Sequence, residues 1–229
     1  MTSRQYEEFV KIRERFRMKI NEYRENHPEF SEEILRIYAH EDDRMRAFVY
    51  NEKLDYLRKN DSIKYIWVTD NPGFNESIQN KYAVGISGKT GKNFMEENGF
   101  VNEFDREVIV LNKSFVHTKV TRELSKFGDY GDLSEDIQNF MGDLACDFQR
   151  LFRCEMWILG TSNLNKIFRV FRENVKKNGN INNMYFYYHF SQGQFKKAYN
   201  KKKSEIIDRD PKEICKIIGI ENRNKLFKG

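Results

Sequence analysis

Short polar side chains follow several apolar runs of this 229-residue sequence, where strands are expected to end. The first group, Asp70-Asn71-Pro72-Gly73, comes directly after Ile63–Thr69, and Glu76 lies a few residues further on. A carboxylate can act as a general base or stabilise a cation, and an amide can orient a water molecule. Pro followed by Gly is also an ordinary turn sequence. The position of this turn after a buried strand is therefore what predicts a site.

Two further polar groups follow apolar runs later in the chain. Asn112 ends the run Glu107–Asn112, and its amide offers one acceptor and two donors, a set that can read the polar edge of a base. An asparagine in this place could equally cap the following helix. His189 and Ser191 follow the aromatic run Met184–Tyr188. A purely structural histidine is the common alternative there, and Ser191 could begin a helix that continues through residues 195–199.

A glycine-rich segment between the first two runs resembles a phosphate-binding P-loop. It reads AVGISGKTG over Ala83–Gly91 and leads into an expected helix over Lys92–Glu97. A true P-loop leaves a buried strand directly, whereas the preceding residues 75–82 are polar and predict no strand. The next strand also ends in Asn112 rather than in a magnesium-binding Asp. Nucleotide hydrolysis is therefore disfavoured.

The polar groups need elements to position them, and the hydrophobic pattern predicts four buried strands. They cover Ile63–Thr69, Glu107–Asn112, Glu155–Gly160 and Met184–Tyr188. Helical periodicity lies between them, over Leu133–Phe152 and about Leu164–Val175. Apolar strands that alternate with helices are typical of a parallel sheet covered on both faces. The expected fold is α/β, with three α/β/α layers around a central four-stranded parallel sheet, and such sheets bind ligands at the carboxyl ends of their strands.

The two ends of the chain are expected to support this core of residues 63–199 within a single domain of residues 1–229. Residues 1–60 predict packing helices, one over Tyr6–Tyr23 and another that starts after Ser31, breaks near residues 40–43 and resumes to about Lys59. The cluster His40-Glu41-Asp42-Asp43 indicates solvated charge rather than a metal site, because consecutive side chains on a helix diverge. Residues 200–229 form a basic segment, in which Lys201-Lys202-Lys203 is a solvated helix face or a phosphate-contacting edge.

Composition narrows the class of protein. A net charge of +5 is compatible with nucleic acid but is not diagnostic of it. Cys146, Cys154 and Cys215 cannot all pair, and their spacing fits neither a zinc ribbon nor a cluster held by four thiolates. No stretch approaches the roughly 18 apolar residues of a membrane span, and the N-terminus is unlike a signal peptide. We expect a cytoplasmic protein that has no membrane partner, metal, iron–sulfur cluster or other cofactor; its oligomeric state is not predicted.

Five features in chain order resemble the motifs of the uracil-DNA glycosylase superfamily. They are Asp70-Asn-Pro-Gly-x-x-Glu76, Val84-Gly-x-Ser-Gly-Lys89, Val110-Leu-Asn112, Trp157-Ile-Leu-Gly160 and His189-x-Ser191. The first two are similar to the thermostable bacterial and archaeal branch, whereas the Asn of the first is similar to the mismatch-specific and single-strand-selective branches. The likeness covers about residues 63–199. The sequence departs from the family in lacking the four cluster cysteines, in having Phe190 for a proline, and in having Ala83 where the thermostable branch has a base-stacking Phe.

This resemblance implies a hydrolase that cleaves the N-glycosidic bond of uracil, or of a related damaged base, flipped out of DNA. Asp70 would act as the base or stabilise the sugar cation, Asn71 would orient water, and His189 would donate to O2 of the leaving base. Asn112 would read the base, and Tyr82 or Phe94 would replace the missing stacking ring. The implied contacts with DNA phosphates are Gly85, Ser87, Gly88, Lys89, Ser191 and Lys201.

Two other interpretations stay open beside a glycosylase. The same fold could bind DNA or a modified base without chemistry, or the pocket could serve an enzyme that acts on a free nucleotide or nucleoside. The glycosylase interpretation makes one geometric demand: Asn71, Asn112 and His189 must meet around a single base-sized hollow.

Overall fold

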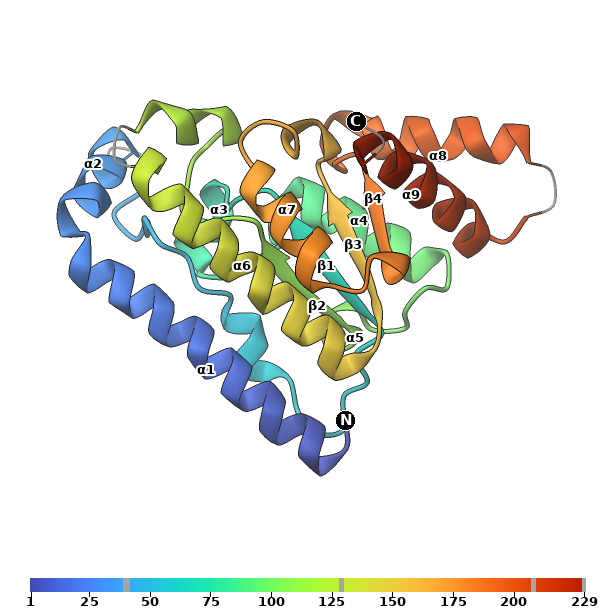
Figure 1. Cartoon of the computed structure of the whole chain (residues 1–229), viewed down its shortest axis with the longest axis horizontal. Helices are drawn as coiled ribbons and strands as arrows, with labels where there is room; N and C mark the ends of the chain where they lie inside the picture. Colours follow the sequence, from blue (N-terminus) through green and yellow to red (C-terminus); the bar gives the residue numbers. More distant parts are fainter. Residues whose placement is uncertain (39–41, 128–129, 207–208, 228–229) are drawn as a thin grey trace.

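Four parallel strands form one sheet in the order β2-β1-β3-β4. The structure is a computed structural model that describes residues 1–38, 42–127, 130–206 and 209–227. The strands are β1 (Tyr65–Thr69), β2 (Val108–Asn112), β3 (Glu155–Leu159) and β4 (Met184–Tyr187). Helices lie on both faces of this sheet (Figure 1). The predicted three-layer α/β/α fold is therefore confirmed.

The direction in which the chain winds reverses at β1. This strand pairs with β2 on one side, with Thr69 opposite Asn112, and with β3 on its other side. The chain leaves β1 for β2 and then crosses back to add β3 and β4 beyond the opposite edge of β1. The carboxyl ends of β1 and β3 flank this switch point, where open α/β sheets bind their ligands.

Each face of the sheet has its own helical cover. On one face Trp67 and Trp157 stack with ring centroids 6.2 Å apart, and α4 (Ile86–Glu97) lies against Trp67. The opposite face is covered by α6 (Tyr130–Phe152), which contacts β1 and β2 and has α7 (Arg169–Asn178) packed beside it (Figure 1). The expected helices at 133–152 and 164–175 thus start at Tyr130 and at Arg169.

The glycine-rich segment is helical, contrary to the prediction of a loop before Lys92. Gly85 is the extended N-cap of α4, and Gly88 and Gly91 lie inside the helix. Glycine usually weakens a helix, but a Cβ at Gly88 would lie 2.4 Å from the backbone of Ala83, and one at Gly91 would lie 2.3 Å from the Trp67 ring. The residues before the segment form α3 (Phe74–Gln79) and no strand leads into it, as predicted. This segment therefore has no P-loop geometry.

The N-terminal region contains two packing helices rather than helix up to Lys59. Helix α1 (Ser3–Asn26) packs on α6, and α2 (Pro28–Tyr38) begins before Ser31. After it, residues 42–51 form no helix, because Phe48 makes an antiparallel bridge with Val116 in the segment after β2. Only a short 3₁₀ helix, η1 (Glu52–Tyr56), follows. The expected break near residues 40–43 lies partly outside the described residues.

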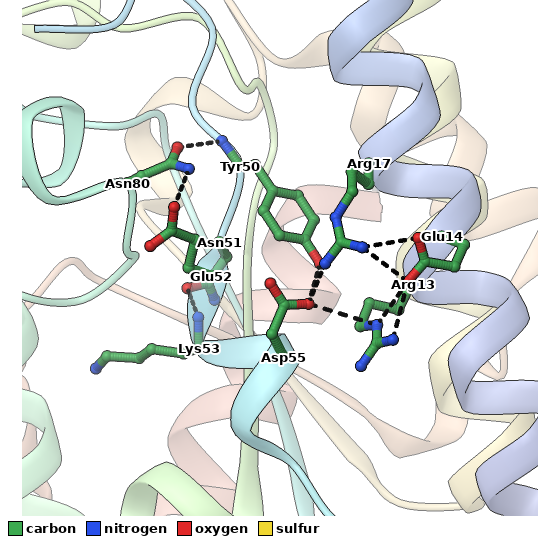
Figure 2. A network of polar contacts seen from close by, with 9 residues as sticks. All are labelled: Arg13, Glu14, Arg17, Tyr50, Asn51, Glu52, Lys53, Asp55 and Asn80. Carbon is green, nitrogen blue, oxygen red and sulfur yellow. Dashed lines mark hydrogen bonds and ion pairs between the residues drawn. The ribbon is translucent and has the colours of Figure 1, made fainter.

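A polar network ties α1 to η1 and to the chain that precedes α4 (Figure 2). Asp55 accepts hydrogen bonds from Arg17 and from the Tyr50 hydroxyl. Asn80, in a left-handed conformation that asparagine tolerates, accepts a bond from the Tyr50 N–H at 3.0 Å. The Asn51 side chain accepts another hydrogen bond, at 3.0 Å, from the backbone N–H of Tyr82. The N-terminal region therefore fixes the backbone that leads into α4.

The C-terminal segment is partly core, not only a basic surface. Helix α8 (Gln194–Glu205) carries Lys201 at its surface, and α9 (Pro211–Phe227) packs on β4. A Cβ at Gly219 would lie 2.6 Å from the Tyr185 side chain, and Asn222 donates to the Phe186 carbonyl at 2.9 Å. Helix α9 therefore contributes buried side chains to the hydrophobic core, among them Ile214 and Ile218.

The remaining short elements connect these layers. They are α5 (Phe104–Glu107), η2 (Thr121–Lys126), η3 (Thr161–Asn163), η4 (Ile181–Asn183) and η5 (Ser191–Gly193). The three cysteines are buried free thiols. Within the described ranges, none of the helices is both long and apolar enough to cross a bilayer.

Candidate active site

A cavity of about 540 Å³ opens at the carboxyl edge of the sheet, beside the switch point. Its wall combines the ends of β1 and β3, the first turn of α4 and the segment after β4. Seven of the predicted site residues line it: Asp70, Asn71, Gly85, Ser87, Gly88, His189 and Ser191. The strand ends thus bring together side chains that lie far apart in the sequence.

Asp70 is a nearly buried carboxylate, 8% exposed, whose oxygens are engaged. One accepts a hydrogen bond from the Lys113 ammonium group and the other from Asn163 Nδ2, at 2.7 Å. Lys113 is wholly buried and also donates to the Leu159 carbonyl. Burial lowers the pKa of Lys113, and the Asp70 carboxylate opposes that shift. This arrangement suits a fixed negative charge better than a mobile proton acceptor.

The side-chain amide of Asn71 makes its hydrogen bonds through the nitrogen, Nδ2. Its Nδ2 donates to Thr118 Oγ1 at 2.8 Å and to the Val116 carbonyl at 3.3 Å. No described hydrogen bond uses its Oδ1. The side chain lines the cavity, so this oxygen is available to accept a hydrogen bond from a ligand or a water molecule.

His189 is half-buried and held in one tautomer. Its Nδ1 lies 3.2 Å from the Ser191 backbone nitrogen, 2.8 Å from Ser191 Oγ and 3.2 Å from Ser87 Oγ. Because a backbone N–H only donates, Nδ1 is an acceptor and the neutral ring carries its proton on Nε2. Burial lowers the pKa of His189; Asp70 opposes this shift and Lys113 adds to it. The ring is therefore neutral near pH 7 and has an Nε2–H to donate.

Asn112 does not reach the cavity. It is 0% exposed, its Oδ1 is bonded to Thr69 Oγ1, and its Nδ2 has no hydrogen-bond partner among the described residues. Thr69 lines the cavity in its place. The expectation of one hollow shared by three side chains therefore holds for Asn71 and His189 and is wrong for Asn112.

The two proposed stacking rings also lie away from the cavity wall. Tyr82 is fully buried, and its hydroxyl donates to the Val49 carbonyl at 2.6 Å. Phe94 packs in an aromatic cluster, with its ring centroid 4.9 Å from that of Phe195. Neither ring can stack on a ligand in the cavity, so the prediction for both is wrong. The aromatic side chains that line the wall are Trp67, Phe74 and Phe190.

The predicted phosphate contacts divide into two groups. Gly85, Ser87, Gly88 and Ser191 line the cavity, but both serine hydroxyls are near His189 Nδ1 and orient the ring. Lys89 and Lys201 are exposed and are not part of the wall. Among the described residues, the cations that line the mouth are Lys119 and Arg122; both are exposed, and neither was predicted from the sequence.

Glu76 joins the turn after β1 to the chain before α4. Its carboxylate accepts the Gly73 N–H at 2.9 Å and the Ala83 N–H at 2.5 Å. Burial raises the pKa of Glu76 to about 7, although the two N–H donors act in the opposite direction. A carboxyl group that titrates near neutrality therefore lies in the cavity wall.

Four residues that shape the site were not predicted: Thr69, Lys113, Thr118 and Asn163. Lys113 carries a signal in the sequence, because it stands between the apolar runs Val108–Leu111 and Phe115-Val116, and a lysine buried in such a place needs an acidic partner. The other three carry none. Their roles depend on which strand ends and loops meet in space.

Comparison with known proteins does not assign this chain to a family. Neither a scan against models of protein families nor a search of curated proteins finds a match to this chain. The likeness to uracil-DNA glycosylases therefore remains a prediction from the five motifs. Among the residues that the structure describes, no group of three or more His, Cys, Asp or Glu side chains could hold a metal ion.

Proposed function

We propose that this protein is a DNA glycosylase-like hydrolase that cleaves the N-glycosidic bond of uracil, or of a related damaged base, flipped out of DNA. One observation carries the proposal: Asp70 with its ion-paired carboxylate, Asn71 with an unengaged side-chain oxygen and His189 with its proton on Nε2 all line one cavity. A protein acting on chromosomal DNA works inside the cell, and the cytoplasmic location expected from the sequence is part of this proposal.

The three groups match the needs of the reaction. Breaking the sugar–base bond leaves positive charge on the sugar and negative charge on the base. Asp70 supplies a fixed negative charge for the sugar, and Asn71 Oδ1 accepts a hydrogen bond from the attacking water and orients it. As the water oxygen bonds to the sugar carbon, the proton that the water loses ends on the departing base anion, which leaves as the neutral base. His189 donates from Nε2 to O2 of the departing base, and a preorganised donor of this kind is worth roughly 3 kcal/mol.

The size and rim of the cavity also fit a nucleotide drawn from DNA. Its volume of about 540 Å³ lies within the usual range for small ligands, about 300–1,000 Å³. Arg122 at the mouth can contact phosphates. The exposed side chains of Ile86 and Val120, 85% and 44% exposed, lie on the same rim. Apolar side chains in such places can fill the gap that a flipped base leaves in the stack.

The test uses oligonucleotides. Single- and double-stranded DNA carrying uracil or other damaged bases is incubated with the protein and then treated with alkali to reveal abasic sites. We expect cleavage with the wild-type protein and loss of cleavage with Asn71→Ala and with His189→Ala. Asn102→Ala, which changes an exposed amide outside the cavity wall, serves as the control. Activity that survives in both cavity variants places the site elsewhere.

A second candidate is a DNA- or modified-base-binding protein of the same fold without chemistry. The observation that favours it is the burial of Asn112, whose amide is bonded to Thr69 and does not reach the cavity. The cavity therefore lacks the side chain that was predicted to read the base. This candidate predicts oligonucleotide binding without release of any base.

A further inference from the structure

The amide of Asn112 has hydrogen-bonding capacity that the fold does not use. The residue is 0% exposed, and its Nδ2 has no partner among the described residues. Buried polar groups in native proteins are nearly always paired, so an unpaired one calls for a physical reason. Asn112 ends β2, at the same edge of the sheet as the cavity.

Thr69 stands between this amide and the cavity. The two residues are directly opposite each other in the parallel pair β1–β2, so their side chains point to the same face of the sheet. β2 is the outer strand, and β1 lies between it and β3, whose end lines the cavity. Thr69 Oγ1 donates to Asn112 Oδ1, and Thr69, not Asn112, belongs to the wall.

We infer that Thr69 sets the specificity of the cavity by sealing the Asn112 amide from the ligand, so that a bound base meets the threonine instead. The inference rests on the proposed function in taking a nucleobase as the ligand. It adds that the protein does not discriminate uracil from cytosine through Asn112, although the motif around that residue predicts this.

The chemistry of the two side chains explains the effect. An exposed amide offers a donor beside an acceptor, which pairs with O4 and N3–H of uracil and mismatches the amino group and N3 of cytosine. The Thr69 hydroxyl directs its only proton to Asn112 Oδ1, which leaves an acceptor and no donor for the base. Removing the threonine side chain therefore exposes a uracil-reading amide that is already in place.

The experiment measures binding rather than cleavage. Single-stranded oligonucleotides carry one 2′-fluoro-2′-deoxyuridine or one 2′-fluoro-2′-deoxycytidine, which resist glycosidic cleavage, and fluorescence anisotropy gives the two dissociation constants. For Thr69→Ala we expect the preference for uracil to rise at least about fivefold, the lower end of what a bidentate base contact contributes. Thr69→Val keeps the shape of the side chain and still covers the Asn112 amide, although it removes the hydroxyl acceptor, so the preference for uracil should not rise as it does in Thr69→Ala.

Adding Asn112→Ala to Thr69→Ala should abolish the gain in uracil preference. Equal ratios for Thr69→Ala and Thr69→Val, or a gain that persists in the double variant, would overturn the inference. The wild-type protein provides a second readout that needs no variant to fold. In ¹⁵N-edited NMR, added uridine should shift the side-chain amide signals of Asn71 and leave those of Asn112 in place, whereas a shift of the Asn112 signals contradicts the seal.

The outcome separates this inference from the proposed function. A change in the binding ratio without cleavage of any substrate rejects the enzyme and keeps the seal. Cleavage of uracil-containing DNA with equal binding ratios in all variants keeps the enzyme and rejects the seal.

Discussion

Asp70 is held at the cavity wall by groups from two other strand ends. Lys113 follows β2, and Gly160 follows β3 in a left-handed conformation with φ of 78°. A Cβ at Gly160 would lie 2.4 Å from Asp70 Oδ1, so only glycine leaves room for this carboxylate. The Lys113–Asp70 pair therefore connects the turn after β1 to both neighbouring strands.

Removing one partner of this pair should be costly. Lys113→Met leaves the Asp70 carboxylate in a nearly buried place without its cation, and such a change typically costs about 3–5 kcal/mol. Urea unfolding followed by circular dichroism measures the loss. The double variant Asp70→Asn/Lys113→Met removes both charges, so its cost should be smaller than the sum of the two single costs. Additive costs would show that the two groups do not act as a pair.

Glu76 should make the folded protein less stable as the pH rises towards neutrality. Its pKa is about 7 in the folded protein and near 4.5 when unfolded. Between these values the unfolded chain releases the proton that the folded protein keeps, so folding loses stability as pH rises from about 4.5 to 7. The loss is at most about 3 kcal/mol, since one pKa unit is about 1.4 kcal/mol. Glu76→Gln should remove this part of the pH dependence in urea unfolding; an unchanged profile contradicts the shift.

Helix α4 packs so closely against its neighbours that two of its positions have room only for glycine, which local sequence does not show. Gly88→Ala would place a Cβ 2.4 Å from the Ala83 backbone, which cannot move aside as a flexible side chain can. We expect a loss of about 1–3 kcal/mol, typical of overpacking, in thermal or urea unfolding. Gly131→Ala, at an exposed position in the first turn of α6 with nothing within 4 Å of the new Cβ, is the matched control and should cost nothing. Equal effects of the two changes would argue against a tight α4 contact.

The sequence predicts the strands well and the connecting segments less well. Strand β2 is buried throughout, and its residues are apolar up to Asn112. Such a run is stable inside a sheet that helices cover on both faces. Residues 44–51 were expected to be helical, but Phe48 within them forms a bridge with Val116, a pairing between residues far apart in sequence. Gly88 and Gly91 suggested a loop because local propensity carries no information about the neighbours that require a glycine there.

The sequence predicts those parts of the site that depend only on which residues follow the strands. Asn71 follows β1 and His189 follows β4, so a parallel sheet brings both to one edge. Asn112 also ends a strand, but whether its amide is open depends on the side chain opposite it on the neighbouring strand. That side chain is Thr69, and the register that pairs the two is a property of the folded sheet.

At the scale of the whole molecule, the position of the cations predicts how DNA binding responds to salt. Arg122 lines the mouth of the cavity, and Lys59 is exposed outside the cavity wall. Each phosphate contact contributes about 0.7 to the slope of log affinity against log salt for single strands. Arg122→Ala should therefore lower that slope by about 0.7 in anisotropy titrations, and Lys59→Ala should leave it unchanged. Lys201→Ala in the same series tests the predicted contribution of α8. A slope that Arg122→Ala does not change would place the DNA elsewhere.

The central claim is that the groups around this cavity break the bond between a damaged base and its sugar. Single-turnover cleavage of uracil-containing single-stranded DNA, with alkali revealing abasic sites, tests it most directly. We expect wild-type protein to produce abasic sites and His189→Ala to do so at least about a hundredfold more slowly, the usual effect of losing a preorganised donor. Equal rates for the two proteins, or no abasic sites with uracil or any other damaged base, would contradict the account.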